Sequence, residues 1–152
     1  MSAEIDATTT PATQHGNGSR RSGSRATTSP EAERAAAVRE AERAADAART
    51  ALADALRTVV RGTVDTATRR RAEYSTDASN YRVVPEAVVY PQDADDVVAA
   101  LDVLRELEVP VTARGAGTSV AGNSIGPGVV LDFTRHVNRV LDVDPEARTA
   151  RI

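Results

Sequence analysis

Short apolar runs bounded by Pro or Gly dominate the C-terminal half of the sequence. Residues 86–90 (Glu-Ala-Val-Val-Tyr) are closed by Pro91, residues 111–114 follow Pro110, and residues 128–133 follow a cluster of glycines. Runs of this length that are rich in β-branched residues are typical of buried strands. We therefore predict three strands in this part of the chain.

A helical pattern separates the first two predicted strands. Asp93 is a suitable N-cap, Asp96 falls in the first turn, and Pro110 ends the segment. A strand, a helix and a second strand in this order predict parallel strands joined by a right-handed crossover, which is an α/β nucleus in an α+β domain. The apolar residues recur at helical spacing, at Val97, Leu101, Leu104 and Leu107.

Two more strands are predicted at the end of the sequence, over residues 139–143 and 149–152, joined by a turn at Asp144-Pro145. The sequence ends within the last of them. Because an unpaired sheet edge is rare in a native domain, we expect residues 81–152 to be an incomplete domain.

The N-terminal half has a different composition. Residues 1–28 are Thr, Ser, Ala, Gly and Arg with almost nothing to bury, which predicts a disordered tail. Ser29-Pro30-Glu31 is a helix start, and residues 29–62 form an Ala- and Arg-rich helix in which Leu52, Leu56 and Val59 make an apolar stripe. No row of large apolar residues marks a coiled coil, so a solvated helix is favoured. Residues 63–80 are left as a connecting segment.

Charge and composition exclude several classes of function. The net charge is −3, with no Lys and no Cys, so we expect no nucleic-acid partner and no iron-sulfur cluster or thiolate-bound zinc in this chain. No apolar run reaches the length that spans a bilayer, and no secretory signal is recognisable. We therefore expect no transmembrane segment and a cytoplasmic protein.

The candidate chemistry lies in residues 114–128, here called the glycine loop, which contain every Gly beyond Gly62. Glycine permits positive φ and close ligand approach, so successive N–H groups can form an anion-binding nest that suits a pyrophosphate. Hydroxyl groups add donors, and Arg114 supplies charge or ties the loop down; a flexible surface loop is the alternative. The candidate cofactor-binding residues are Arg114, Gly115, Ala116, Gly117, Thr118, Ser119 and Gly122.

Two well-known phosphate loops do not fit these residues. In the dinucleotide-binding fingerprint a third Gly opens a helix, whereas here Val120 takes that position and a strand follows. In the P-loop a Lys reaches the terminal phosphates, whereas here Asn123 takes that position.

Three other features have plainer explanations than function. His136 is expected to have a packing or surface role after the third strand, Asp77 to form a turn, and residues 69–71 (Arg-Arg-Arg) to be a solvated helix end. No catalytic or metal-binding residue is predicted.

Several motifs in order, over residues 70–152, resemble the FAD-linked oxidases with the vanillyl-alcohol-oxidase type, or PCMH-type, FAD-binding domain. They are residues 74–81 (Tyr-Ser-Thr-Asp-Ala-Ser-Asn-Tyr), 85–91, 110–119 with Ala121-Gly122, 128–132 and 138–141. The resemblance is closest to bacterial D-2-hydroxyacid dehydrogenases, which oxidise D-lactate, glycolate or 2-hydroxyglutarate and add a C-terminal iron-sulfur region.

This resemblance implies an N-terminal fragment of a flavoprotein oxidoreductase that passes a hydride from a 2-hydroxy acid to FAD. It implies that residues 115–119, with Gly122 nearby, wrap the FAD diphosphate through backbone N–H groups. Covalent members carry a His at the position of Thr118, so FAD is expected to be non-covalent here. The alternative is a non-catalytic fragment or interaction module without flavin. This chain alone is expected to be inactive.

Overall fold

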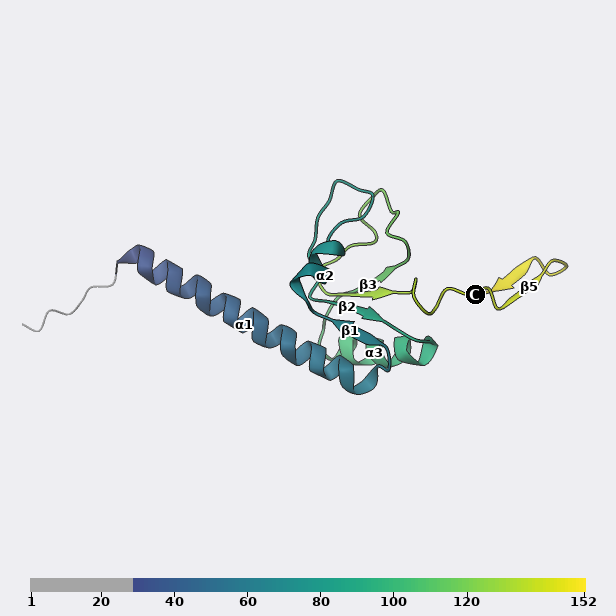
Figure 1. Ribbon diagram of the computed structural model, residues 1–152, viewed down its shortest axis with the longest axis horizontal. Coiled ribbons are helices and arrows are strands. Elements are labelled where there is room, and N and C mark those ends of the chain that lie inside the picture. The colour runs from purple at the N-terminus through teal and green to yellow at the C-terminus, as the bar shows by residue number, and fades with distance from the viewer. Residues whose placement is uncertain (1–28) are drawn as a thin grey trace, which may run out of the picture.

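The computed structural model describes residues 29–152, and the predicted disordered tail lies outside them. A long helix leads into a small α+β body, from which a hairpin extends at the far end (Figure 1). The helices are α1 (Pro30–Val59), α2 (Thr68–Glu73) and α3 (Ala94–Glu106). The strands are β1 (Thr63–Asp65), β2 (Ala87–Tyr90), β3 (Val111–Arg114), β4 (Val129–Asp132), β5 (Asp142–Asp144) and β6 (Thr149–Arg151).

The body is built on a four-stranded sheet in the order β1-β2-β4-β3. β4 pairs in parallel with both β2 and β3, which confirms the predicted parallel nucleus and places β4 between the strands that α3 connects. β1 pairs antiparallel with β2. Every residue of β2 and β4 is buried, because helices cover both faces of these central strands, while the edge strand β3 is partly exposed.

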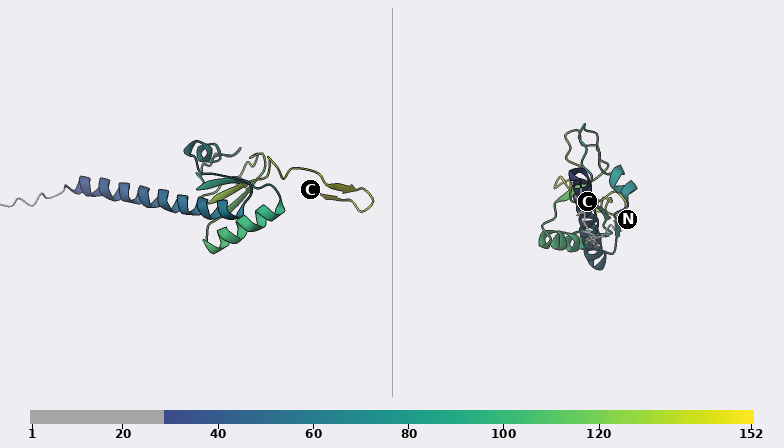
Figure 2. Two further views of the ribbon diagram at one scale, coloured as in Figure 1. Left: turned by 60° about the horizontal axis from the view of Figure 1, so that its bottom comes forward. Right: turned by 90° about the vertical axis from the view of Figure 1, so that its left-hand side faces the viewer.

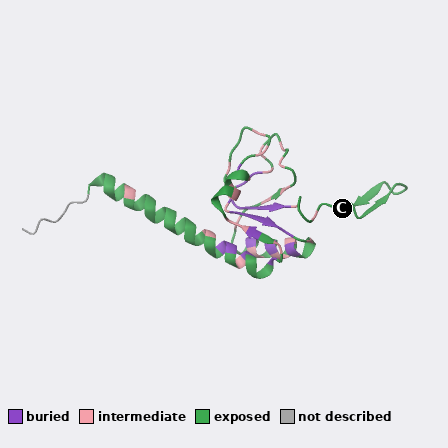
Figure 3. Ribbon diagram, viewed as in Figure 1, coloured by how far each residue is buried: buried purple, intermediate pink, exposed green. Residues whose placement is uncertain are grey.

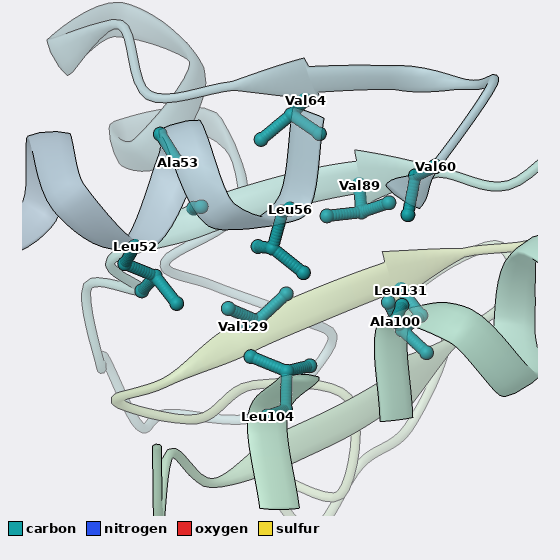
Figure 4. Close-up of a cluster of buried hydrophobic side chains, with 11 residues drawn as sticks. Leu52, Ala53, Leu56, Val60, Val64, Val89, Ala100, Leu104, Val129 and Leu131 are labelled. Atoms are coloured by element: carbon teal, nitrogen blue, oxygen red, sulfur yellow. The ribbon is translucent and has the colours of Figure 1, made fainter. Parts of the chain in front are cut away.

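The helices lie on opposite sides of the sheet. The C-terminal part of α1 and α3 cover one face and α2 lies on the other (Figure 2). The core between α1, α3 and the sheet consists of Leu, Val and Ala side chains (Figure 4). The first half of α1 projects beyond the body and is almost entirely exposed, as predicted (Figure 3).

Both helix starts were predicted correctly. The Ala32 N–H donates to Ser29 Oγ at 3.2 Å, and the N–H groups of Asp95 and Asp96 donate to Asp93. These side-chain acceptors satisfy donors that lack a partner in the first turn of a helix. The predicted boundaries of the two helices therefore needed little correction at their N-terminal ends.

The apolar stripes were predicted less well. In α1, Leu52 and Leu56 are buried, but Val59 is 41% exposed. In α3, Leu104 is buried and Val97 packs against the core, but Leu101 is 43% exposed, and Leu107 at the C-cap is 50% exposed. Small residues replace them on the buried faces, since Ala53 and Ala100 are each almost inaccessible.

The segment over residues 63–80 is not a simple connection, because it contains β1 and α2. Residues 69–71 lie within α2, and only Arg69 is solvated as predicted. Arg70 lies 5.9 Å from the centre of the Tyr90 ring, and the Arg71 Nε–H donates to the Pro85 carbonyl at 2.6 Å. These two arginines fasten α2 to the sheet, so the prediction of a solvated helix end is corrected.

The C-terminal strands form a separate two-stranded hairpin, β5-β6. β5 begins at Asp142 rather than at residue 139, and Arg148 in the connecting turn has φ 53°. The Ala147 N–H donates to the Asp144 side chain at 2.9 Å, which closes the turn. The predicted hairpin is therefore confirmed with a shifted first strand and a longer turn.

A buried carboxylate joins α1, β1 and α3. Asp96 accepts hydrogen bonds from the backbone N–H groups of Arg61, Gly62 and Gln92 at 2.9–3.0 Å, and from Arg61 Nε at 3.2 Å. Burial by itself would raise the pKa of Asp96, but these donors stabilise the ionised form and hold the pKa below its ordinary value. A Cβ on Gly62 would overlap the Tyr90 carbonyl, so this junction also requires glycine.

Candidate functional site

The glycine loop leaves the carboxyl end of β3 and returns to the amino end of β4. In an open α/β sheet, ligands bind outside the carboxyl ends of the strands. The predicted site residues are brought together on this loop, and Gly115, Ala116 and Thr118 are exposed while Gly117, Ser119 and Gly122 are half-buried. Figure 1 shows the loop beside the segment that precedes β2.

The backbone of residues 115–119 has free donors. Within the described part of the chain, none of these N–H groups makes a hydrogen bond. Gly117 has φ 70° and Gly122 has φ 78°, the left-handed conformation that glycine accommodates without strain. A run of unpaired N–H groups on an exposed loop with positive-φ glycine is the arrangement that binds an anion such as a diphosphate.

The Arg114 side chain fixes the position of the glycine loop. Its Nη1 donates to the carbonyls of Thr76 and Ser124, both at 3.0 Å, and its guanidinium lies 4.9 Å from the centre of the Tyr74 ring. A Cβ on Gly117 would lie 2.7 Å from Arg114 Cζ, so the loop backbone passes directly over the guanidinium. Of the two roles left open by the sequence, the contacts support tying the loop down.

Gly115 differs from Gly117 in its surroundings. A Cβ on Gly115 would meet nothing within 4 Å, and Gly115 is not among the positive-φ residues. A side chain there would therefore project into open space without straining the loop. A side chain at this position would therefore clash with a bound ligand but not with the rest of the protein.

The segment over residues 74–83 forms a second side of the site. Asp77 accepts from the N–H groups of Ser79 at 2.9 Å and Ser124 at 3.3 Å, which confirms its turn-forming role and adds a link to the glycine loop. Hydrogen bonds from Ser79, together with the Ser124 N–H and the charge of Arg114, hold the pKa of Asp77 below its ordinary value. Asp77 is therefore an anion that links residues 74–83 to the glycine loop.

Sequence reasoning missed a polar cluster under the loop. The Tyr74 hydroxyl donates to the buried carboxylate of Asp132 at the end of β4, and the Tyr90 hydroxyl donates to Tyr74 at 3.1 Å. Burial and the hydrogen bond to Asp132 raise the pKa of Tyr74, so its phenol stays protonated. A polar residue ending an otherwise apolar buried run, as Asp132 does, was the signal that could have revealed it.

The remaining candidates lie elsewhere. His136 is exposed, in a small cavity with Gln92 and Asp93 of the α3 start, as expected for a surface role. A larger cavity of about 610 Å³ lies at the opposite ends of the strands, lined by α1 and by Pro110 and Pro127. Its one cation, Arg49, pairs with Glu86 at 2.8 Å and with Asp46. This cavity is mainly apolar and does not suit a phosphate.

No helix among residues 29–152 is long and apolar enough to cross a bilayer.

Part of the chain matches a known protein family. The family described as FAD binding domain matches residues 85–152. A D-2-hydroxyglutarate dehydrogenase from Pseudomonas putida is 37% identical over 95 residues, which cover 60% of this chain and 9% of that protein. The glycolate oxidase subunit GlcD from Bacillus subtilis is 36% identical over 85 residues, covering 54% of this chain and 18% of that protein.

A solved structure shares the fold at lower identity. Wild-type Physcomitrella patens BBE-like 1 is 20% identical, with a TM-score of 0.50 over 65% of this chain and 22% of that chain. Residues 85–152 therefore match the FAD binding domain family, and the resemblance to FAD-linked oxidases is confirmed. The chain spans less than a fifth of the length of either curated relative named above.

Proposed function

We propose that the glycine loop binds the diphosphate of FAD through the backbone N–H groups of residues 115–119, with Gly122 shaping the turn. The observation that carries this proposal is the run of N–H groups without an internal acceptor, on an exposed loop fixed by Arg114. The open space beside Gly115 supports it, because the diphosphate can approach the backbone there. FAD, when bound, supplies the capacity to accept a hydride.

In this proposal the residues of this chain bind and orient FAD and take no part in the redox reaction. Arg114 and Asp77 keep the loop in shape, and the hydroxyls of Thr118 and Ser119 supplement the backbone donors. The Ser119 oxygen accepts from the Asn123 N–H at 3.1 Å, which shapes the loop and leaves the Ser119 O–H available as a donor. The names of the longer relatives indicate oxidation of 2-hydroxy acids, and we infer the same substrate class for this protein.

We further infer that FAD is held without a covalent bond. Thr118 occupies the position at which covalent flavoproteins of this type carry His, and its exposed side chain makes no hydrogen bond to a base among the described residues. An unassisted Thr hydroxyl is a poor nucleophile. Acid denaturation should release all flavin into the filtrate, whereas flavin fluorescence on the polypeptide band of a denaturing gel would show a covalent link.

A substitution at Gly115 tests the loop directly. Gly115→Val should weaken FAD binding at least tenfold, about 1.4 kcal/mol. The thermal melt should be unchanged, because the new side chain would clash with bound FAD but with no other residue of the protein. Titration calorimetry with FAD measures the affinity. Val120→Ala, on an exposed side chain of the same loop, is the matched control and should bind like the wild type. Wild-type affinity in Gly115→Val would refute the assignment of the loop.

Gly117 is a less informative position. Gly117→Val should also abolish binding, but the positive φ and the Arg114 guanidinium mean that the loop itself would be disturbed. Only the Gly115 variant separates ligand contact from loop structure.

A further inference from the structure

Tyr81 is an exposed aromatic residue beside the glycine loop. The chain contains 3 Tyr, 1 Phe and no Trp, and the other two tyrosines are hydrogen-bonded to each other beneath the loop. Tyr81 is 64% exposed, and among the described residues its hydroxyl has no hydrogen-bond partner. An aromatic ring left open next to a candidate nucleotide site is a possible stacking surface.

The Tyr81 side chain rests on the loop backbone. A Cβ on Gly122 would lie 3.0 Å from Tyr81 Cδ2, so the ring packs against the position where that glycine lacks a side chain. Gly122 belongs to the turn that Ser119 closes by accepting from the Asn123 N–H. Tyr81 is therefore close to the C-terminal end of residues 115–119, which carry the unpaired N–H groups.

The segment that carries Tyr81 is fixed in place. The Tyr81 N–H donates to Ser79 Oγ at 3.1 Å, and the Val83 N–H donates to the Ser75 carbonyl at 2.9 Å. Arg114 and Asp77 join the same segment to the glycine loop. Because these anchors hold the backbone on both sides of Tyr81, its ring is presented at a defined place and little conformational entropy is lost on stacking.

We propose that Tyr81 stacks on a planar ring of the bound dinucleotide, either the adenine or the isoalloxazine. This inference rests on the proposed function and extends the site beyond the family match, which begins at residue 85. Every such ring offers a π-face to an aromatic side chain, and stacking needs no hydrogen bond from the Tyr81 hydroxyl. The contact therefore depends on the ring and not on the phenol group.

Three variants test the stacking contact. Tyr81→Leu should bind FAD about tenfold more weakly than the wild type, while Tyr81→Phe should bind with nearly wild-type affinity because it keeps the ring. Val84→Ala, another exposed apolar position of the same segment, is the control and should change nothing. Circular dichroism should show the same melt for all three, since none of these side chains is buried.

Titrations with ADP and with FMN identify the ring. ADP carries the adenine and FMN the isoalloxazine, so the ligand whose affinity falls in Tyr81→Leu contains the stacked ring. If the isoalloxazine is stacked, bound FAD should also fluoresce more strongly in Tyr81→Phe, because Phe quenches flavin far less than Tyr does.

The outcomes separate this inference from the proposed function. Wild-type FAD affinity in Tyr81→Leu, with weakened binding in Gly115→Val, would overturn the stacking contact and leave the loop assignment standing. Equal losses in Tyr81→Leu and Tyr81→Phe would overturn stacking in favour of the hydroxyl. Absence of FAD binding by the wild-type chain would overturn both.

Discussion

At the scale of single residues, the buried carboxylate of Asp96 stabilises the fold, whereas the proposed FAD site relies on backbone N–H groups. Its oxygens accept from three backbone N–H groups and from the Arg61 side chain, which joins the start of α3 to the segment between α1 and β1. An Asn at this position would offer one acceptor oxygen and would turn an NH₂ group toward the remaining donors. The charge and the acceptors of Asp96 are therefore both required.

Asp96→Asn should lower the free energy of unfolding by about 3 kcal/mol at pH 7. Because the folded-state pKa of Asp96 lies below its ordinary value, its contribution is complete above the unfolded pKa of about 4 and disappears as pH falls through the folded pKa. Urea denaturation between pH 7 and pH 2.5 measures both effects, and the variant should lose less stability than the wild type below pH 4.

The neighbouring Asp95 provides the control. It lies in the same first turn of α3 but is exposed, so Asp95→Asn should cost less than about 1 kcal/mol, the size of a helix-dipole effect. Equal destabilisation by the two variants would show that Asp96 acts through the helix end alone.

At the scale of elements, the docked half of α1 shows what residue spacing predicts well. The stripe of Leu52 and Leu56 was recognised because large apolar residues four apart face the same way. Val59 is three residues beyond Leu56 and fits the same stripe, yet it is 41% exposed because the helix ends there and Val60 turns into the core instead. The spacing of apolar residues identifies which face of the helix is buried, but not where the sheet that covers this face ends.

Leu56→Ala should destabilise the protein by about 3 kcal/mol, since Leu56 is fully buried among β2, β4 and α3 and its loss leaves a cavity. Val59→Ala should cost less than about 1 kcal/mol because its side chain already meets solvent. Chemical denaturation of both variants measures the difference. Comparable losses at the two positions would mean that α1 is docked through a different face.

The short elements could not be predicted from the sequence. β1 has three residues and α2 has six, too few for either periodicity to emerge. β1 exists because Val64 completes the core beside Val89. α2 is held because Arg70 lies against the Tyr90 ring and Arg71 donates to the Pro85 carbonyl just before β2. Both depend on tertiary contacts between residues that are distant in sequence.

At the scale of the whole molecule, the sequence predicts the candidate loop but not the residues that surround it. The clustering of glycine pointed to residues 115–119 as the candidate site, because every Gly beyond Gly62 falls within residues 114–128. Tyr74 and Tyr81 come from the segment before β2 and Asp132 from the end of β4. Tertiary contacts bring them to the loop, because Tyr74 donates to Asp132 and the Tyr81 ring lies against Gly122. Local composition cannot reveal contacts that the sheet topology creates.

The apolar hairpin is a second feature of the whole molecule. Val140, Leu141, Val143 and Ile152 are between 55% and 84% exposed, although large apolar side chains are normally buried. They lie on or next to the exposed β5-β6 hairpin, which extends away from the body (Figure 3). Exposed apolar side chains of this kind promote association with other apolar surfaces in solution.

The residues around the glycine loop lead to a last prediction, that this chain with FAD has no dehydrogenase activity. Removal of a hydride from a 2-hydroxy acid needs a base at the substrate hydroxyl. Among the described residues near the loop, Asp77 is committed to the Ser79 and Ser124 N–H groups and its lowered pKa makes it a poor base, while Asp132 is buried against Tyr74. His136 lies beside the start of α3.

Oxidation of D-2-hydroxyglutarate or glycolate by the chain with FAD should therefore proceed no faster than with free FAD. Reduction of an artificial electron acceptor, followed by absorbance, measures the rate, and the Pseudomonas putida relative is the positive control. A rate above that of free FAD, abolished in Asp77→Asn while FAD affinity is retained, would show that Asp77 acts as the base. In that case the hydrogen bonds from Ser79 and Ser124 would have to be broken when substrate binds, because a carboxylate that accepts both has little affinity left for a substrate proton.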